Sequence, residues 1–189
     1  MVCRKLITAT IVTINGGSGN DRFRVGQLFT AYTADAEFGI PAAEFFTSTR
    51  GSLSNGISFP ATINGGTGDD VFEVFRNKAS LTLNGDAGDD IFIIRTFVAE
   101  SEVTAVNSGQ GRDYIEYATN APVAIDGGDG NDLVAVIGTE LGDTFVVTAT
   151  GVYGAGRFVS YVNIERLSLY GMEGDDRFFV VSTNAAVQT

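Results

Sequence analysis

The chain has 189 residues, of which 44% are hydrophobic, so it is long and apolar enough to bury a sizeable core as one domain. Its 23 acidic and 12 basic residues give a net charge of −11, which argues against nucleic acid and anionic membranes as partners because both require clustered positive charge. There is no histidine and one cysteine, Cys3, so an intrachain disulfide, a thiolate metal cluster and the commonest transition-metal ligand are all excluded.

The first residues combine two basic side chains with a short, threonine-rich apolar run that leads directly into a repeat. This run resembles a signal peptide only superficially, and no stretch approaches the ~20 apolar residues of a membrane span, so we expect no membrane insertion. Both ends lie in register with the repeat and lack a polar cap. We therefore expect either a piece of a longer protein or a module that stacks end to end.

One pattern recurs six times: an aliphatic strand, Asn or Asp, a short glycine-rich turn, and an aspartate followed by alternating apolar residues. The copies occupy residues 14–25, 63–74, 83–94, 106–117, 125–136 and 169–180. Their last aspartates, Asp21, Asp70, Asp90, Asp113, Asp132 and Asp176, are 49, 20, 23, 19 and 44 residues apart. A unit this short cannot bury a core alone, so identical units must stack and share one.

A coil of about twenty residues holds two or three short strands joined by tight turns, as in a parallel β-solenoid. Each of the two long gaps is close to two such units. The pattern therefore predicts an all-β chain, a single repeat domain over residues 1–189, with about eight coils of roughly 19–25 residues. An antiparallel sandwich of hairpins, the main alternative, would have turns of varied length and type.

Two apolar positions after each aspartate alternate with period two and should point into the core. They are Phe23, Phe72, Phe92, Ile115, Val134 and Phe178 at the second position, and Val25, Val74, Ile94, Tyr117, Val136 and Val180 at the fourth. Stacked coils would turn the first set into a phenylalanine ladder. The residues directly after the aspartates, Val71, Ile91, Tyr114 and Leu133, should point outward and be covered by another segment, such as 26–61, or by a partner.

Two segments depart from the repeat. Residues 26–61 are expected to form one coil plus a lateral loop, with a helical turn near 33–38. Residues 137–168 are expected to form strands with glycine turns, and Asp143, followed by Thr144 and Phe145, is interpreted as a decayed copy of the motif.

Twelve of the 14 aspartates lie within the motifs or their lead-in residues, whereas the glutamates scatter. In stacked coils, Asp70, Asp90, Asp113 and Asp132 would stand at a sheet spacing of ~4.8 Å and repel one another. Asp69 and Asp89 would add to this repulsion. Carboxylates and glycine-turn carbonyls are the hard oxygen ligands that Ca²⁺ selects, so a calcium ion shared by two coils would convert the repulsion into a cross-brace.

The segments GGSGNDRFR, GGTGDDVFE and GGDGNDLVA match the pattern GGxGxDx(apolar)x, and three further copies depart from it at one glycine. The chain thus resembles the RTX, or haemolysin-type, calcium-binding nonapeptide repeats, which form a right-handed parallel β-roll. The resemblance implies calcium as the cofactor, a right-handed solenoid (β-roll or β-helix), and loop carbonyls and motif aspartates as ligands. Residue by residue these are Asp21, Asp70, Asp90, Asp113, Asp132, Asp176, Gly65, Gly68, Gly85, Gly88, Gly109, Gly111, Gly127 and Gly130.

The motif appears once per coil, whereas the repeats of the family run in tandem, so only one edge of the solenoid is expected to carry ions. Complete neighbours exist along Asp70, Asp90, Asp113 and Asp132, which allows up to three sites between coils. A metal-free alternative stays open. Asparagines that precede the turns could hydrogen-bond into a ladder and support the stack alone; they are Asn15, Asn64, Asn84 and Asn107, with Asp126 in the same place.

We expect a calcium-binding structural or adhesive module of a secreted or cell-surface bacterial protein, with calcium, other copies end to end, or surface polymers as partners. A self-assembling extracellular filament subunit is one alternative. The other is a polysaccharide-active β-helix enzyme, for which Arg76 and Arg95 would be the only candidate bases. No nucleophile–base constellation or phosphate loop is present in the sequence, so we do not expect an enzyme.

Overall fold

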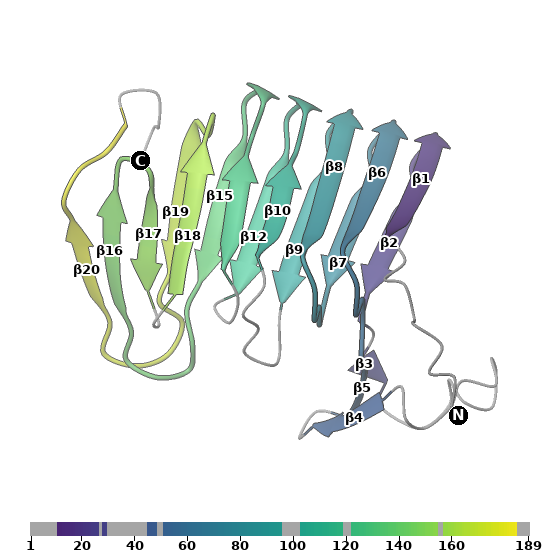
Figure 1. The fold of residues 1–189 in the computed structure, drawn as a ribbon. Helices are drawn as coiled ribbons and strands as arrows, with labels where there is room; N and C mark the ends of the chain where they lie inside the picture. The colour runs from purple at the N-terminus through teal and green to yellow at the C-terminus, as the bar shows by residue number, and fades with distance from the viewer. Residues whose placement is uncertain are drawn as a thin grey trace, which may run out of the picture.

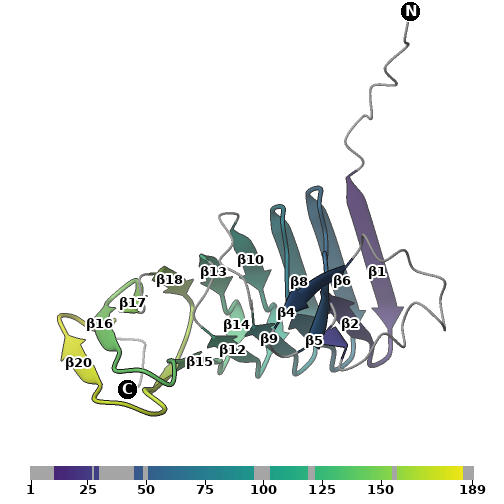
Figure 2. The ribbon, with the colours of Figure 1, turned by 90° about the horizontal axis from the view of Figure 1, so that it is seen from below.

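The computed structural model describes residues 11–26, 28–29, 45–48, 51–95, 103–118, 122–154 and 157–184. All regular structure in these residues is β-strand, with no helix, as the sequence predicts. Figure 1 shows the strands standing side by side in an elongated stack, and Figure 2 shows the same layers from below.

Most strands belong to two sheets. Six parallel strands of the first sheet are β1 (Val12–Ser18), β6 (Ala61–Thr67), β8 (Leu81–Ala87), β10 (Thr104–Asn107), β13 (Val123–Asp126) and β18 (Arg157–Val162). The second sheet, also parallel, contains β2 (Arg22–Val25), β7 (Val71–Val74), β9 (Ile91–Arg95), β12 (Tyr114–Ala118), β15 (Leu133–Ile137) and β19 (Arg166–Tyr170).

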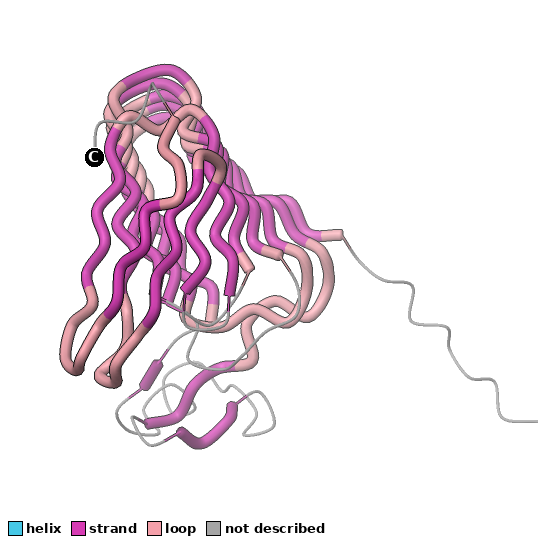
Figure 3. Tube along the Cα trace, turned by 90° about the vertical axis from the view of Figure 1, so that its left-hand side faces the viewer, coloured by secondary structure: helices cyan, strands magenta, loops and turns pink. Residues whose placement is uncertain are grey.

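The chain alternates between these sheets, and each of the six parallel strands named for the first sheet leads through a turn into a strand of the second. Two short strands, β11 (Gln110–Gly111) and β14 (Asp129–Gly130), pair with each other within the turns. This alternation is that of a parallel β-solenoid, and Figure 3 shows the superimposed coils from one end of the stack. The right-handed winding stays a prediction.

The described residues wind six times, since the second sheet has six strands, and the prediction of about eight coils is not confirmed. The first long gap contains no coil: β1 and β2 pair directly with β6 and β7, with Asn15 opposite Asn64 and Phe23 opposite Phe72. A coil cannot be inserted between strands that already share hydrogen bonds. The described residues between β2 and β6 therefore form a lateral excursion, and the extra coil predicted within 26–61 is not present between these strands.

The excursion has strands of its own, β3 (Leu28–Phe29), β4 (Phe45–Ser48) and β5 (Gly51–Ser54), which form a small antiparallel sheet beside the stack (Figure 1). The chain rejoins the stack where Ile57 bridges Asn77. The helical turn predicted near 33–38 lies outside the described residues.

The second long gap also holds no complete coil. After β15 the chain passes through a turn into β16 (Thr144–Thr148), reverses into β17 (Gly151–Gly154), and reverses again into β18, which pairs in parallel with β13. The next winding ends in β20 (Arg177–Val180), which lies in parallel on β16. An antiparallel detour therefore replaces the extra coil that the spacing suggested.

The predicted inward positions form the core. Phe72 and Phe92 are fully buried, and their rings stack at 4.6 Å between centroids with 5° between planes; Phe23 continues this ladder at 4.9 Å from Phe72. Ile115 and Val134 extend the row. The last copy differs, because its Phe178 stacks on Phe145 at 5.3 Å and stays 49% exposed at the end of the stack.

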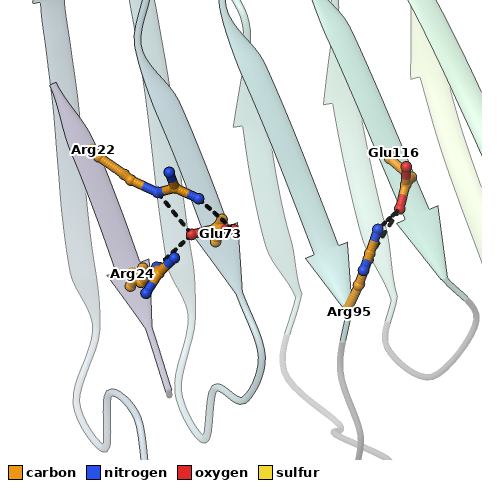
Figure 4. A network of polar contacts seen from close by, with 5 residues as sticks. All are labelled: Arg22, Arg24, Glu73, Arg95 and Glu116. Carbon is orange, nitrogen blue, oxygen red and sulfur yellow. Dashed lines mark hydrogen bonds and ion pairs between the residues drawn. The ribbon is translucent and has the colours of Figure 1, made fainter. Parts of the chain in front are cut away.

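The outward positions of the second sheet carry mixed side chains. Ile91 is 38% exposed and Val71, Tyr114 and Leu133 are half-buried, which confirms their outward orientation. Cover by a segment such as 26–61 stays a prediction. Ion pairs lie beside them on the same face: Glu73 accepts hydrogen bonds from Arg22 and Arg24, and Glu116 accepts them from Arg95 (Figure 4).

Replacing Phe92 by alanine should lower the free energy of unfolding by about 3–5 kcal/mol, because it opens a cavity between Phe72 and Ile115 in the closed core. Replacing its outward neighbour Ile91 by alanine should cost about 1 kcal/mol or less. Urea denaturation of both variants measures the difference. Equal losses would contradict the assignment of inward and outward faces.

Candidate functional site

The turns that join the sheets need glycine for two separate reasons. At Gly66 and Gly68 the backbone has φ values of 111° and 120°, which L side chains rarely adopt. At Gly65 the φ is ordinary, but a Cβ would collide with the carboxylate of Asp70 and lie 2.9 Å from the carbonyl oxygen of Gly85. Asp86 takes the place of Gly66 in the next coil at φ 72° and shows that this position tolerates some strain.

The motif aspartates form a buried ladder of hydrogen bonds behind the turns. The backbone N–H of Asp70 donates to Oδ1 of Asp90 at 2.7 Å, that of Asp90 to Asp113 at 2.8 Å, and that of Asp113 to Asp132 at 2.9 Å. Asp21 joins the same ladder by donating its N–H to Asp70 at 2.7 Å. The structure thus brings five of the six predicted aspartates into one column.

The second oxygen of each carboxylate in this column is buried without a hydrogen-bond partner among the described residues; these atoms are Oδ2 of Asp21, Asp70, Asp90, Asp113 and Asp132. Burial raises the pKa of Asp90 and of Asp132 to about 6 and raises the pKa of Asp70 and Asp113, and each shift is only partly offset by the backbone N–H bond that the carboxylate accepts. Neighbouring carboxylates raise the pKa of Asp90 further. The column therefore holds negative charge that the protein alone does not compensate.

Carbonyl oxygens of the following coil face the same carboxylates. The space that a Cβ would occupy at Gly85 is bounded by the carboxylate of Asp90 and by the carbonyl oxygen of Ser108. At Gly127 it is bounded by the Asp132 carboxylate and the carbonyl oxygen of Asn163. Each of these glycines thus lies between a carboxylate of its own coil and a carbonyl of the next.

The fourth coil departs from this pattern, because Ser108 takes the place of the first glycine. Its side chain is buried, and its hydroxyl donates to the carbonyl oxygen of Gly127 at 2.8 Å. This hydroxyl also acts to lower the pKa of Asp113, although burial raises that pKa overall. The motif sequence SGQG signals the departure, but not the contact that the hydroxyl makes.

The column ends on a residue that the sequence analysis missed. The N–H of Asp132 donates to Oε2 of Glu165 at 2.9 Å, so a glutamate takes the place of the next aspartate. The pairing of Asp126 with Val162 and of Leu133 with Arg166 leaves only three residues, 163–165, in this turn. The longer glutamate side chain spans the distance that the shorter turn leaves.

Asp176 does not join the column. The N–H of Asp143 donates to Oδ1 of Asp176 at 2.8 Å, so the decayed copy and the sixth copy form a separate stack of two turns between the second sheet and β16 and β20. The space beside Gly138 lies 2.7 Å from Oδ2 of Asp143 and 2.8 Å from the carbonyl oxygen of Gly171, as in the main column, but this Oδ2 accepts hydrogen bonds from the N–H and the hydroxyl of Thr139. The motif thus also occurs where a strand of the second sheet leads back into the first, and that ions bind at one edge alone stays a prediction.

The predicted asparagine ladder is present in the structure. Nδ2 of Asn64 donates to Oδ1 of Asn15, Asn84 donates to Asn64, and Asn107 donates to Asn84, each at 2.7 Å. In the last coil Asn163 donates to Asp126 at 2.8 Å. These bonds stabilise the stack whether or not a metal is bound.

A third ladder runs along the exposed rim. Its N–H groups donate to the preceding coil, whereas those of the buried aspartate column donate to the following coil. The N–H of Asp69 donates to Asn20, that of Asp89 to Asp69 and that of Arg112 to Asp89, at 3.0, 2.9 and 2.8 Å. The glycines predicted as ligands separate accordingly. Gly65, Gly85 and Gly127 border the buried column, whereas Gly68, Gly88, Gly111 and Gly130 stack on one another near the rim, and the carbonyl oxygens of Gly109 and Gly111 accept N–H bonds from the next coil.

The donor set suits a hard cation, because every candidate ligand atom is a carboxylate or carbonyl oxygen. No group of three acidic, histidine or cysteine side chains converges on one point among the residues that can be examined. An ion held here would therefore depend on backbone carbonyls for part of its coordination, as the sequence analysis assumed.

The two arginines considered as catalytic bases are engaged elsewhere. Arg95 pairs with Glu116 at 2.5 Å, and Nη1 of Arg76 donates to Asn55 at 3.3 Å. Across the described part of the chain, no helix is long and apolar enough to cross a membrane.

In the presence of a chelator, the protein should become more stable as the pH falls from 7 to 5. The folded-state pKa values of Asp90 and Asp132, about 6, lie above the ~3.9 of an unfolded aspartate, so folding takes up protons in this interval and stability is lost as the pH rises through 6. The lowered pKa of Glu73, caused by its hydrogen bond from Arg22, acts only below this interval. Thermal unfolding in chelator at both pH values measures the effect, and a lower melting temperature at pH 5 would contradict it.

Comparison with known proteins agrees with the motif. The family model described as the RTX calcium-binding nonapeptide repeat, with four copies, matches residues 12–27 and 61–73, which are the first two coils and lie directly against each other in the fold. Neither the comparison with curated proteins nor that with solved structures gives a match. RTX repeats bind Ca²⁺. The first two coils of this chain are therefore similar to RTX calcium-binding nonapeptide repeats.

Proposed function

We propose that this chain is a calcium-stabilised structural module in which the ions bind along the buried aspartate column and join successive coils. The observation that supports this most directly is the row of buried, unpartnered Oδ2 atoms of Asp70, Asp90, Asp113 and Asp132. A buried carboxylate oxygen without a partner is costly unless it is protonated or bound to a cation. At neutral pH a cation is the more effective solution for several carboxylates in one row.

Calcium fits this row better than a smaller or softer ion. The ligands would be the carboxylates of one coil and the carbonyls of the next, with Gly65, Gly85 and Gly127 leaving the space between them open. Ca²⁺ accepts six to eight oxygen ligands in flexible geometry, whereas Mg²⁺ requires near-ideal octahedral coordination at shorter distances. Asp21 and the separate Asp143–Asp176 pair are further candidate positions, each with fewer neighbours than the central column.

Because Asp70, Asp90 and Asp132 are fully buried, an ion would be enclosed as the coils close over one another, and binding would be coupled to folding. The stack would then fold where calcium is abundant, outside the cell, and stay incompletely folded where calcium is scarce. We therefore place the module on an extracellular or cell-surface bacterial protein. Its role there would be mechanical, as a rigid spacer or adhesive segment.

Adding calcium to chelated protein should raise the melting temperature by roughly 5–10 °C if one site is occupied at about a hundredfold excess over its dissociation constant, since this contributes about 2.7 kcal/mol. Magnesium at the same concentration should give a much smaller rise. Differential scanning calorimetry in chelator, calcium and magnesium measures both. No shift with calcium would leave the asparagine ladder as the support of the turns and would refute the proposed function.

Asp90→Asn should reduce the calcium-induced rise in melting temperature more than Asp21→Asn, because Asp90 has column neighbours on both sides and Asp21 on one. For each variant, the melting temperature in chelator is subtracted from that in calcium, so that a loss of stability caused by the substitution itself cancels. Isothermal titration calorimetry with calcium gives the number of binding sites that each variant has lost. Equal losses in the two variants would contradict bridging between coils.

A further inference from the structure

Among the described residues, each end of the stack is a strand–turn–strand unit whose two strands have a neighbour on one side only. At one end, β1 and β2 are the edge strands of the first and second sheets, joined by the turn 19–21. At the opposite end the order of the sheets is reversed: β19 is the edge strand of the second sheet and β20 that of the first, and the turn 171–176 joins them. Figures 1 and 2 place β1 and β20 at opposite extremes of the molecule.

The polar ladders leave complementary groups at these two ends. In the buried ladder each N–H donates to the aspartate of the following coil, so Oδ1 of Asp21 receives no bond and the N–H of Asp176 makes none within the described residues. In the rim ladder the direction is reversed, and the N–H of Asn20, at its first end, makes no bond within the described residues. Asp175, which precedes Asp176 as Asn20 precedes Asp21, offers a carboxylate at the other end. One end thus presents the acceptor and the donor that the other end lacks.

Both ends of the stack also expose apolar side chains that are inward-facing in the middle of the stack. At the first end, Ile14 is 41% exposed, and a cavity of about 490 Å³ is lined by Ile14, Phe23, Val25 and Ile63, with Arg22 and Arg24 and residues 54–57 of the excursion at its side. At the other end, the exposed apolar residues include Phe178 at 49%, Val180 at 67% and Tyr170 at 51%. The row of inward side chains, buried along the middle of the stack, is open at both ends.

We propose that copies of this chain associate head to tail, with the β19–turn–β20 coil of one copy pairing in parallel with the β1–turn–β2 coil of the next. In this register Asp176 lies against Asp21, Phe178 against Phe23 and Val180 against Val25, so the aspartate and aromatic ladders continue from one copy into the other. The turns correspond in sequence, with Asp-Arg-Phe at 176–178 and at 21–23. The contact uses two different surfaces and is therefore heterologous, which generates an open filament or a ring.

A second copy fits these ends better than an unrelated partner, because the donors, acceptors and side-chain spacing of one end match those of the other position by position. One contact opposes the association: Arg177 would stand beside Arg22 of the next copy, and like charges directly opposite in a sheet are destabilising. Glu73 already binds Arg22 and Arg24 on the other side, as Figure 4 shows, and offsets part of this repulsion. The association goes beyond the proposed calcium function and does not require it.

Sedimentation velocity of the full chain over a range of concentrations tests this association. Phe178→Asp and Ile14→Asp should each shift the association midpoint by about tenfold or more, because each buries a charge at one of the two surfaces. Ile91→Asp, which alters an exposed apolar residue in the middle of the stack, is the matched control and should leave the midpoint unchanged. Arg177→Glu should strengthen the association, because it replaces the opposing arginine by a partner for Arg22.

Mixing the two end variants separates head-to-tail pairing from a symmetric dimer. The intact first end of the Phe178→Asp protein can still bind the intact last end of the Ile14→Asp protein, so the mixture should form dimers but nothing larger. Circular dichroism and the melting temperature of each variant in calcium and in chelator establish that it folds and responds to calcium as the wild type does. Three results would overturn the inference: monomers throughout for both the wild type and Arg177→Glu, association insensitive to both end variants, or wild-type association with no dimers in the mixture.

Discussion

The structure depends on a buried carboxylate that belongs to two coils at once. Asp90 accepts the N–H of Asp70 through Oδ1, and its own N–H donates to Asp113, so the column fixes the distance and register of three successive windings. A slip of one residue in a strand would exchange the inward and outward faces, removing Phe92 from the core and exposing Asp90 to solvent. The glycine at position 85 follows from the same contact, because any side chain there would displace the carboxylate.

Two other ladders reinforce this register without burying charge. The asparagine amides pair along the strand ends and the rim carboxylates bind N–H groups of the next coil, so each turn is held at three depths. The asparagine ladder was considered as an alternative to calcium, yet the two are compatible, since the amides and the buried Oδ2 atoms are different groups. Among the described ladder residues, the buried Oδ2 atoms have no hydrogen-bond partner whereas the asparagine amides bind one another, so calcium binding is expected to act on the column more than on the asparagines.

The fold class and most of the column could be predicted from the sequence because both are set by local, repeated patterns. The alternation at Phe72 and Val74 places the inward face, and the fixed spacing of Asp70 and Asp90 from their glycines places the turn. The errors came from the gaps between copies. A gap of 49 residues between motif aspartates has the length of two coils, but one coil plus a lateral excursion between β2 and β6 has the same length, so the spacing alone does not distinguish them. Glu165 was missed because its turn has lost the glycines that identify the others.

The sequence by itself determined that this protein is built from stacked strand–turn–strand units with oxygen-rich turns, since those properties depend on residues a few positions apart. Tertiary structure decided which turns are neighbours. The motif copy of Asp176 departs at one glycine, as do those of Asp90 and Asp113, which join the column. Asp176 nevertheless pairs with the decayed turn at Asp143, because the β16–β18 detour brings β18 back onto β13 and leaves Glu165 beside Asp132. That outcome is set by long-range strand pairing, whose energy depends on residues far apart in the chain, so no local pattern records it.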